Sequence, residues 1–166
     1  MTLGRFILRE AEFQAFQAIL RKLLSDSYAK VVFLVDKNGT LLASVGATEG
    51  FDTTSLASLA AGNIAATGGL ANLIGEKEFS ILFHEGERDN IHISIVAGRV
   101  ILVVIFDERS SLGLVRLRVK KAAQELADVF GRIMAKVEKE RATAGAAFES
   151  PFAEITDEDI DNLFND

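Results

Sequence analysis

The two histidines are the residues best suited to acid–base or metal chemistry in this chain of 166 residues. Neither His84 nor His92 has a cysteine or another histidine at the spacing that zinc sites use. His84 is expected at the end of a strand beside Glu85, as an ordinary surface histidine. The sequence therefore predicts neither a metal site nor a catalytic histidine.

Nucleophilic and carboxylate chemistry has no better support. The chain contains no cysteine, which excludes thiolate catalysis and a disulfide framework. The serines lie in no G-x-S-x-G nucleophile elbow. Acidic residues cluster in short loops and near the C-terminus, without the rigid pocket that catalytic carboxylates need. We therefore expect a protein with no active site of its own.

The glycines in residues 61–70 invite a phosphate-binding interpretation. However, neither GxxxxGK[ST] nor a GxGxxG that follows a strand occurs in the chain. These glycines also lie inside a predicted helix, and not at its N-terminus, where free amides can bind phosphate. We expect no nucleotide site and no cofactor.

Residues 52–75, DTTSLASLAAGNIAATGGLANLIG, are predicted to form a helix with two unlike faces. Larger residues share one face: Leu56, Leu59, Asn63, Thr67, Leu70 and Ile74. Small residues share the other: Ser58, Ala61, Gly62, Ala65, Gly68, Gly69 and Asn72. We expect the larger face to pack inward, with Asn63 and Thr67 hydrogen-bonded to backbone.

The small-residue face lacks the charged side chains of a solvent-facing helix. Each interior glycine costs roughly 1 kcal/mol relative to alanine. Close approach of another backbone is the simplest compensation for that cost. We therefore predict that this face is an interface.

The flanking segments predict an α+β layer fold with an antiparallel five-stranded sheet. The expected order is a helix at about 8–25, strands at 30–36 and 40–46, the glycine-rich helix, strands at 78–84, 91–97 and 100–106, and a helix at about 110–141. Asn38-Gly39 and Gly98-Arg99 predict hairpins. Strands 31–35 and 100–106 are apolar on both faces, so helices or a second subunit should cover both sides of the sheet.

The composition changes after Arg141, which divides the chain into a domain at 1–141, a flexible linker at 142–150 and an acidic tail helix at 151–166. Thr156 and Asp159 form a helix start of the capping-box type. The tail's apolar residues are Phe152, Ile155, Ile160, Leu163 and Phe164. Because so short a helix is unstable alone, we expect it to fold into a partner's groove. Docking onto its own domain and solvated disorder are the alternatives.

The net charge of −6 resides in that tail, which carries six acidic residues and no lysine or arginine from Glu154 onward. A neutral body with an acidic tail argues against nucleic-acid binding. No apolar run is long enough for membrane insertion, and MTLGRFILRE becomes charged too early for a signal peptide, so we expect a cytoplasmic protein. Arg116, Arg118, Lys120 and Lys121 form a basic run. It is either a solvated helix face or an acceptor for an acidic partner or the tail.

The order of elements and several strings resemble the Roadblock, or dynein-light-chain-type, family, and in particular its bacterial polarity proteins. The strings are KVVFLVDKNG, DTTSLASLAAGN, GGLANLIGE, FHEG, VVIFDERSSLGLVRLRVKKA and SPFAEITDEDIDNLF. The resemblance covers residues 30–166, whereas the first 29 residues match only as an amphipathic helix.

This resemblance implies a homodimer in which sheets join edge to edge and the glycine-rich helices lie side by side. It also implies a GTPase-activating protein for a small Ras-like GTPase of the MglA type in its GTP form. Such dimers are understood to remodel the GTPase active site without inserting the arginine finger of other activators. The residues facing the GTPase would be Ala61, Gly62, Ala65, Gly68, Gly69 and Asn72.

The implied setting is cell polarity and gliding motility, with other polarity proteins as further partners and a location at a cell pole. We add the hypothesis that the tail binds the GTPase at a second site and modulates nucleotide exchange. The alternative is a Roadblock scaffold that dimerises and recruits a GTPase or polarity proteins without stimulating hydrolysis.

Overall fold

The computed structural model describes residues 2–3, 6–7 and 10–152, and it divides into two compact units, Met1–Phe130 and Gly131–Asp166. The first unit contains β1 (Thr2–Leu3), β2 (Phe6–Ile7), α1 (Glu10–Ser27), β3 (Val31–Asp36), β4 (Leu41–Gly46), α2 (Thr53–Leu73), β5 (Ile81–Glu85), β6 (Asn90–Val96) and β7 (Val100–Phe106). The last helix, α3 (Leu112–Phe152), begins in the first unit and continues through the described part of the second. The predicted α+β order and five-stranded antiparallel sheet are confirmed.

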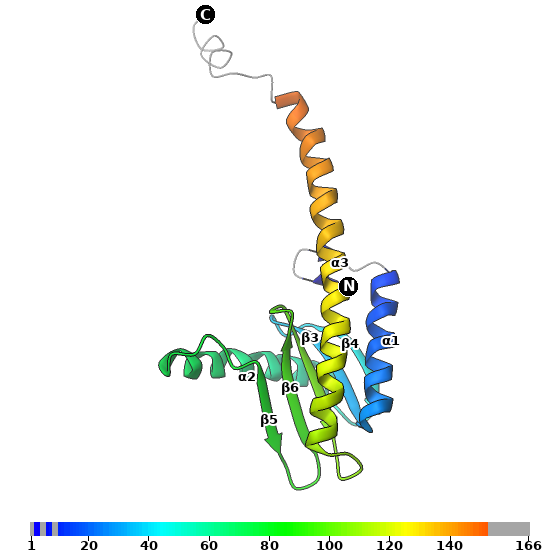
Figure 1. Ribbon diagram of the computed structural model, residues 1–166, viewed down its shortest axis with the longest axis vertical. Coiled ribbons are helices and arrows are strands. Elements are labelled where there is room, and N and C mark those ends of the chain that lie inside the picture. Colours follow the sequence, from blue (N-terminus) through cyan, green and yellow to red (C-terminus); the bar gives the residue numbers. More distant parts are fainter. Residues whose placement is uncertain (1, 4–5, 8–9, 153–166) are drawn as a thin grey trace, which may run out of the picture. The chain divides into compact units, whose positions relative to one another are not determined.

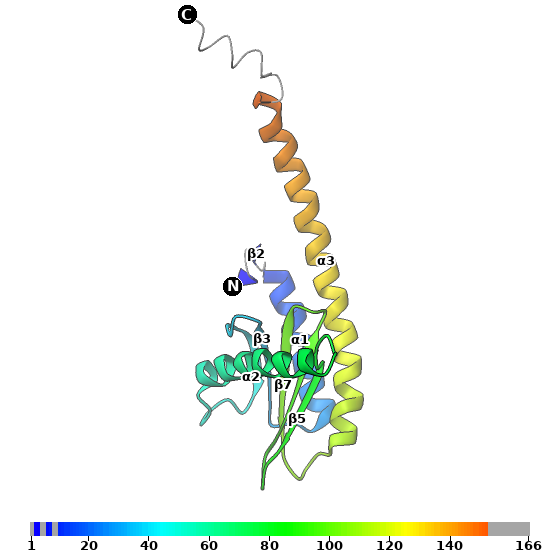
Figure 2. The ribbon, with the colours of Figure 1, turned by 90° about the vertical axis from the view of Figure 1, so that its left-hand side faces the viewer.

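The main sheet has the strand order β4-β3-β7-β6-β5, and every neighbouring pair is antiparallel. β3 and β7 lie near its centre and are buried along their whole length. In Figures 1 and 2, α2 covers one face of the sheet, and α1 with the first part of α3 covers the other. This arrangement explains why the central strands are apolar on both sides.

The first hairpin turns at the predicted place. Gly39 has a φ of +90° and donates its backbone N–H to the carbonyl of Asp36. The Asp36 carboxylate accepts the backbone N–H groups of Asn38 and Thr40, both at 2.9 Å. An aspartate that caps its own turn and a glycine in the left-handed region together fix the β3–β4 connection.

The second helix also has the predicted ends. Asp52 caps its N-terminus by accepting the backbone N–H of Ser55 at 3.1 Å and the hydroxyl of the same serine at 2.6 Å. At the other end Gly75 adopts a φ of +82°, and Glu76 donates its N–H back to the carbonyl of Ala71. These are the caps that stop a helix sharply at both ends.

The boundaries after β7 differ from the prediction. α3 was expected to end near Arg141 before a flexible linker at 142–150, but it continues to Phe152. Alanines at 142, 144, 146 and 147 are strong helix formers and outweigh the single Gly145. The compact first unit ends at Phe130 instead of at 141. Residues 153–166, which hold most of the predicted tail helix, lie outside the described residues.

Candidate interaction surface

The second helix contacts the sheet through a third face that the sequence analysis did not single out. Ala57, Ala60 and Ala61 join a core cluster with strand residues such as Phe33 and Val103. Ile64 packs against the same cluster. At about 100° per residue, this face lies between the two predicted faces. The expectation that the larger face packs inward is therefore wrong for most of its residues, although Leu56 at its N-terminal end packs against the same cluster.

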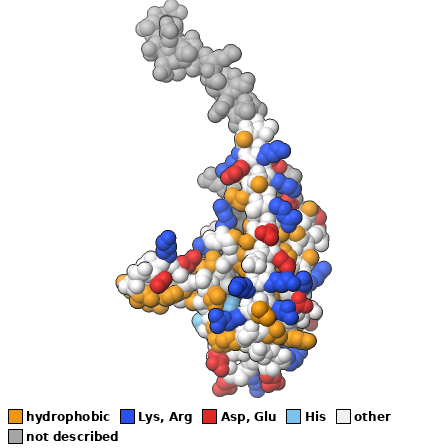
Figure 3. All heavy atoms as spheres, in the orientation of Figure 1, with side chains coloured by type: hydrophobic (Ala, Val, Ile, Leu, Met, Phe, Trp, Pro, Cys, Tyr) orange, Lys and Arg blue, Asp and Glu red, His pale blue; other side chains and the backbone are white. Residues whose placement is uncertain are grey.

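The larger residues consequently lie on an exposed flank. Leu59, Leu70, Leu73 and Ile74 are 71%, 57%, 84% and 69% exposed. In Figure 1 the C-terminal part of α2 projects past the edge strand β5, and Figure 3 shows hydrophobic side chains along its lower side. We call Leu59, Asn63, Leu70 and Ile74 the leucine flank. An exposed apolar helix flank of this kind is a candidate interaction site.

Most of the predicted small-residue site lies on the opposite flank of α2. Gly62, Ala65, Gly69 and Asn72 are exposed, and we call them the small-residue flank. Gly68 is half-buried, and Ala61 is only 8% exposed because it packs in the core. The sequence pattern could have separated Ala61 from the others, because Ala57, Ala60, Ala61 and Ile64 recur at helical spacing.

The glycines of α2 meet nothing in the described structure. A Cβ built on Gly62, Gly68 or Gly69 would have no atom within 4 Å. The close approach that would justify three interior glycines is therefore not made within the described chain. This observation is the main structural support for an external occupant of the helix.

The edge strand β5 lies beside the leucine flank. It pairs only with β6 among the described strands, so its outer backbone groups have no strand partner there. Asn63 of α2 and His84 of β5 are joined by a 2.8 Å hydrogen bond between the side-chain amide nitrogen and Nε2. The leucine flank therefore lies directly beside the β5 edge.

The two polar residues within the larger face have different partners. The Thr67 hydroxyl donates to the backbone carbonyl of Asn63 at 2.9 Å, as expected. The Asn63 side chain instead pairs with a ring nitrogen of His84, so the prediction of a backbone partner is wrong for this residue. The described residues include no group of three or more potential metal ligands.

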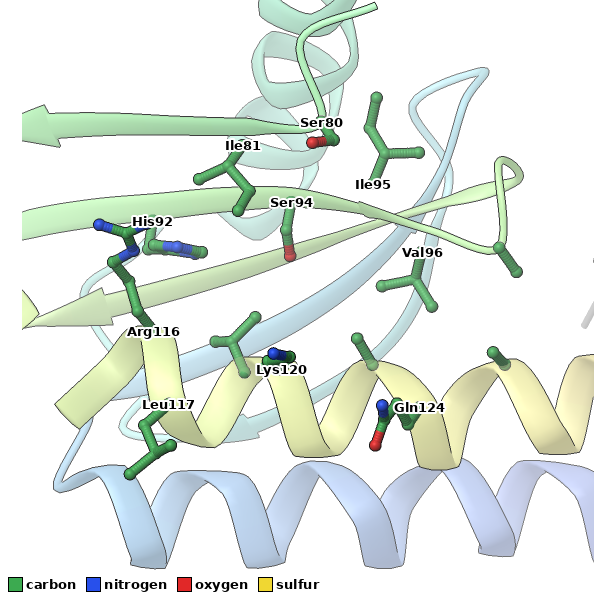
Figure 4. Close-up of a pocket in the computed structure, with 14 residues that line it drawn as sticks. Ser80, Ile81, His92, Ser94, Ile95, Val96, Arg116, Leu117, Lys120 and Gln124 are labelled. Carbon is green, nitrogen blue, oxygen red and sulfur yellow. The ribbon is translucent and has the colours of Figure 1, made fainter. Parts of the chain in front are cut away.

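The basic run divides between two sides of α3. Arg116 and Lys120 line a hollow beside β6, whereas Arg118 and Lys121 line a smaller one with Lys22 of α1. The first hollow, which we call the β6–α3 groove, has a volume of about 680 Å³. Figure 4 shows its residues on β5, β6 and α3. Ser80, Ile81, His92, Ser94, Ile95, Val96, Ala97, Leu117, Val119, Ala123, Gln124 and Ala127 complete its lining.

His92 is fully buried at this groove. Neither ring nitrogen has a hydrogen-bond partner among the described residues. Its burial lowers the pKa of His92 below the ordinary histidine value, and the positive charge of Arg116 lowers it further. The imidazole is therefore held in its neutral form.

The chain matches a known family. Residues 15–106 match the model of the Roadblock/LC7 domain. This chain therefore belongs to the Roadblock/LC7 family. No curated protein sequence matched the chain. No helix among the described residues is long and apolar enough to span a membrane.

Among solved structures, the chain is similar to MglB. It is 58% identical to Myxococcus xanthus MglB, over 77% of this chain and 96% of that one, with a TM-score of 0.73. It is 34% identical to the gliding protein MglB of Thermus thermophilus, over 75% and 95%, with a TM-score of 0.71. An MglB solved in a tetrameric arrangement is 32% identical over 78% and 97%, with a TM-score of 0.73.

Proposed function

We propose that this protein is a GTPase-activating partner of a small Ras-like GTPase of the MglA type, and that it acts in cell polarity and gliding motility. The observation that carries the proposal is the 58% identity to Myxococcus xanthus MglB over nearly all of that chain. The exposed apolar residues of α2 support regulation through binding.

The active form is a homodimer joined through the leucine flank and the β5 edge. Leu59, Leu70 and Ile74 expose apolar surface on the side of α2 where Asn63 contacts β5. A second β5 strand would satisfy the open backbone groups of this edge. The twin α2 helices would then bury the leucines against each other, which supplies the hydrophobic free energy of association.

The GTP-bound GTPase docks on the small-residue flank. Gly62, Ala65, Gly69 and Asn72 are exposed and bring little side-chain bulk, so another backbone can approach closely. Gly68 is half-buried beside this surface, and Ala61 lies in the core beneath it. α2 carries no arginine or lysine that could act as a finger. The resemblance to MglB implies that stimulation works by remodelling the GTPase active site.

The C-terminal tail adds a second contact with the same GTPase. Phe152, Ile155, Ile160, Leu163 and Phe164 supply the apolar residues for that contact. Because the tail is tethered to a domain that is already bound to the GTPase, its effective concentration at the second site would be in roughly the mM range. A chain ending at Ser150 should therefore bind the GTPase more weakly and alter its nucleotide exchange. Unchanged affinity, hydrolysis and exchange would contradict this role.

GTP turnover by the cognate GTPase, with and without the full chain, tests the main proposal. An activator accelerates hydrolysis, whereas the alternative, a Roadblock scaffold that only recruits the GTPase or polarity proteins, leaves the rate unchanged. Co-sedimentation measured in parallel shows whether binding occurs in both cases. Binding without acceleration would establish the scaffold and overturn the activator.

A further inference from the structure

The β6–α3 groove has the properties of a binding site, and the interaction surface on α2 leaves it unexplained. Its volume of about 680 Å³ falls within the range of ligand sites. In Figure 4, the His92 ring and the Ser94 hydroxyl lie between β6 and α3. Both residues are more than nine-tenths buried, and the two ring nitrogens and the serine Oγ have no hydrogen-bond partner among the described residues.

Such unpaired polar atoms point to an occupant that carries hydrogen-bonding groups. Leaving a buried donor or acceptor unsatisfied costs about 1–3 kcal/mol. Because the pKa of His92 is lowered, its neutral ring offers one donor and one acceptor. An occupant with amide or hydroxyl groups can satisfy both.

The remaining lining is apolar with a basic rim. Ile81 and Leu117 are 49% and 62% exposed, so large apolar surface is open to an occupant. Arg116 and Lys120 lie exposed on the α3 side, and neither forms an ion pair with another described residue. The groove therefore suits a segment that is apolar on one side and acidic on the other.

We propose that the β6–α3 groove binds the acidic C-terminal tail, residues 152–166, of a second copy of this chain. Ile160, Leu163 and Phe164 have the i, i+3, i+4 spacing with which a helix presents apolar residues to a groove. Six acidic residues of the tail, without a single basic one, complement Arg116 and Lys120. Asn162 and Asn165 would lie on the opposite side of such a helix, away from the groove.

The reach of the chain assigns the tail to a second copy. Within the second unit, α3 runs from Gly131 to Phe152, about 32 Å of helix. Ile160 follows Phe152 by eight residues, which a fully extended chain spans in at most about 29 Å. Ile160 therefore cannot return even to Gly131 of its own chain, and the groove belongs to the first unit.

This contact links copies of the protein and requires no GTPase. If the tail also binds the GTPase as proposed above, the two sites compete for the same segment. Binding of the GTPase would then release the groove and dissolve the contact between copies. The regulatory consequence depends on the proposed function, whereas the contact itself does not.

Paramagnetic broadening between two populations of full-length protein tests the contact. One population contains no isotope label and carries the substitution Asp166→Cys, with a nitroxide attached to the new thiol. This thiol is the sole one in the protein, because the chain otherwise has no cysteine. The other is ¹⁵N-labelled and carries no nitroxide. We expect broadening of the amides of Ile81, Ser94 and Lys120, together with a shift of the His92 ring nitrogens.

Matched variants give the test its specificity. In the tail, Leu163→Ser with Phe164→Ser should weaken the association at least tenfold, approximately, whereas Asn162→Ser with Asn165→Ser should retain most of it. In the domain, Lys120→Glu should reduce the broadening, whereas Lys121→Glu should not, because Lys121 lies outside the groove.

Three results would overturn the inference. The first is no broadening at the groove in the mixed sample. The second is equal broadening in the apolar and control tail variants. The third is broadening at the groove only when nitroxide and ¹⁵N lie on the same chain, which would contradict the reach argument.

Discussion

The side-chain amide of Asn63 lies 2.8 Å from Nε2 of His84, although 21 residues separate the two in sequence. Asn63 belongs to α2 and His84 to the edge strand β5. Because an amide nitrogen can only donate, Nε2 accepts this hydrogen bond. This bond places the leucine flank of α2 beside the open edge of the sheet.

Removing this hydrogen bond should loosen α2 from β5. We expect Asn63→Ala and His84→Ala to couple by about 0.5–1.5 kcal/mol in the free energy of unfolding. A double-mutant cycle in urea, at fixed protein concentration, measures this coupling. Thr67→Val with His84→Ala serves as the control, since Thr67 bonds only to backbone. Additive effects of Asn63→Ala and His84→Ala would show that the bond does not form in solution.

The leucine flank should hold the dimer together. Leu70→Asp with Ile74→Asp places charges on side chains that are 57% and 69% exposed in the single chain. The fold of the chain should therefore survive while the dimer dissociates, as sedimentation analysis and circular dichroism would show. Tyr28→Asp, at a residue 65% exposed on the other side of the sheet from α2, should remain dimeric. A dimeric double variant would refute this interface.

Replacing a glycine of α2 should separate stability from function. Gly69→Ala should stabilise the helix by up to 1 kcal/mol, approximately, because a Cβ there meets nothing within 4 Å. It should also reduce stimulation of the GTPase by adding bulk to the docking surface. Gly131→Ala, at another open glycine, should leave stimulation unchanged. A loss of stability in Gly69→Ala, measured by urea unfolding, would contradict the open environment.

The buried imidazole should make stability fall on the acid side of neutrality. Burial lowers the pKa of His92 in the folded state below the ordinary histidine value of 6.5, and the charge of Arg116 acts in the same direction. The unfolded chain therefore binds more protons, and the free energy of unfolding decreases as the pH falls below 6.5 toward the folded pKa.

The expected slope is at most about 1.4 kcal/mol per pH unit. Urea unfolding at several pH values between neutral and moderately acidic conditions measures it. His92→Leu should flatten this part of the profile. An identical pH dependence in His92→Leu and the wild type would show that His92 does not titrate as the structure indicates.

Much of the fold follows directly from the sequence. The apolar runs of β3 and β7 and the turn glycine at 39 determine the central strands and first hairpin, and Asp52 determines where α2 begins. The short strands β1 and β2 were not expected, because two residues each are too few for a period-two pattern.

The orientation of α2 was harder to predict. This helix carries no charged residue on any side, so the pattern does not identify one inward face. The bulky residues of β3 and β7 decide the packing in favour of Ala57, Ala60 and Ala61. The β6–α3 groove could not be predicted from the sequence either. It is lined by residues of β5, β6 and α3, and the pairing of β5 with β6 is needed to bring its strand residues together.

The most direct test of the central claim is single-turnover GTP hydrolysis by the cognate GTPase with variants of the small-residue flank. Ala65→Arg with Gly69→Arg blocks the proposed docking surface, and Gly113→Arg with Ala135→Arg is the matched control at exposed positions of α3. We predict that the wild type and the control accelerate hydrolysis. With the flank variant, the hydrolysis rate should equal that of the GTPase without any activator. Full acceleration by a folded flank variant, or none by the wild type, would contradict the account.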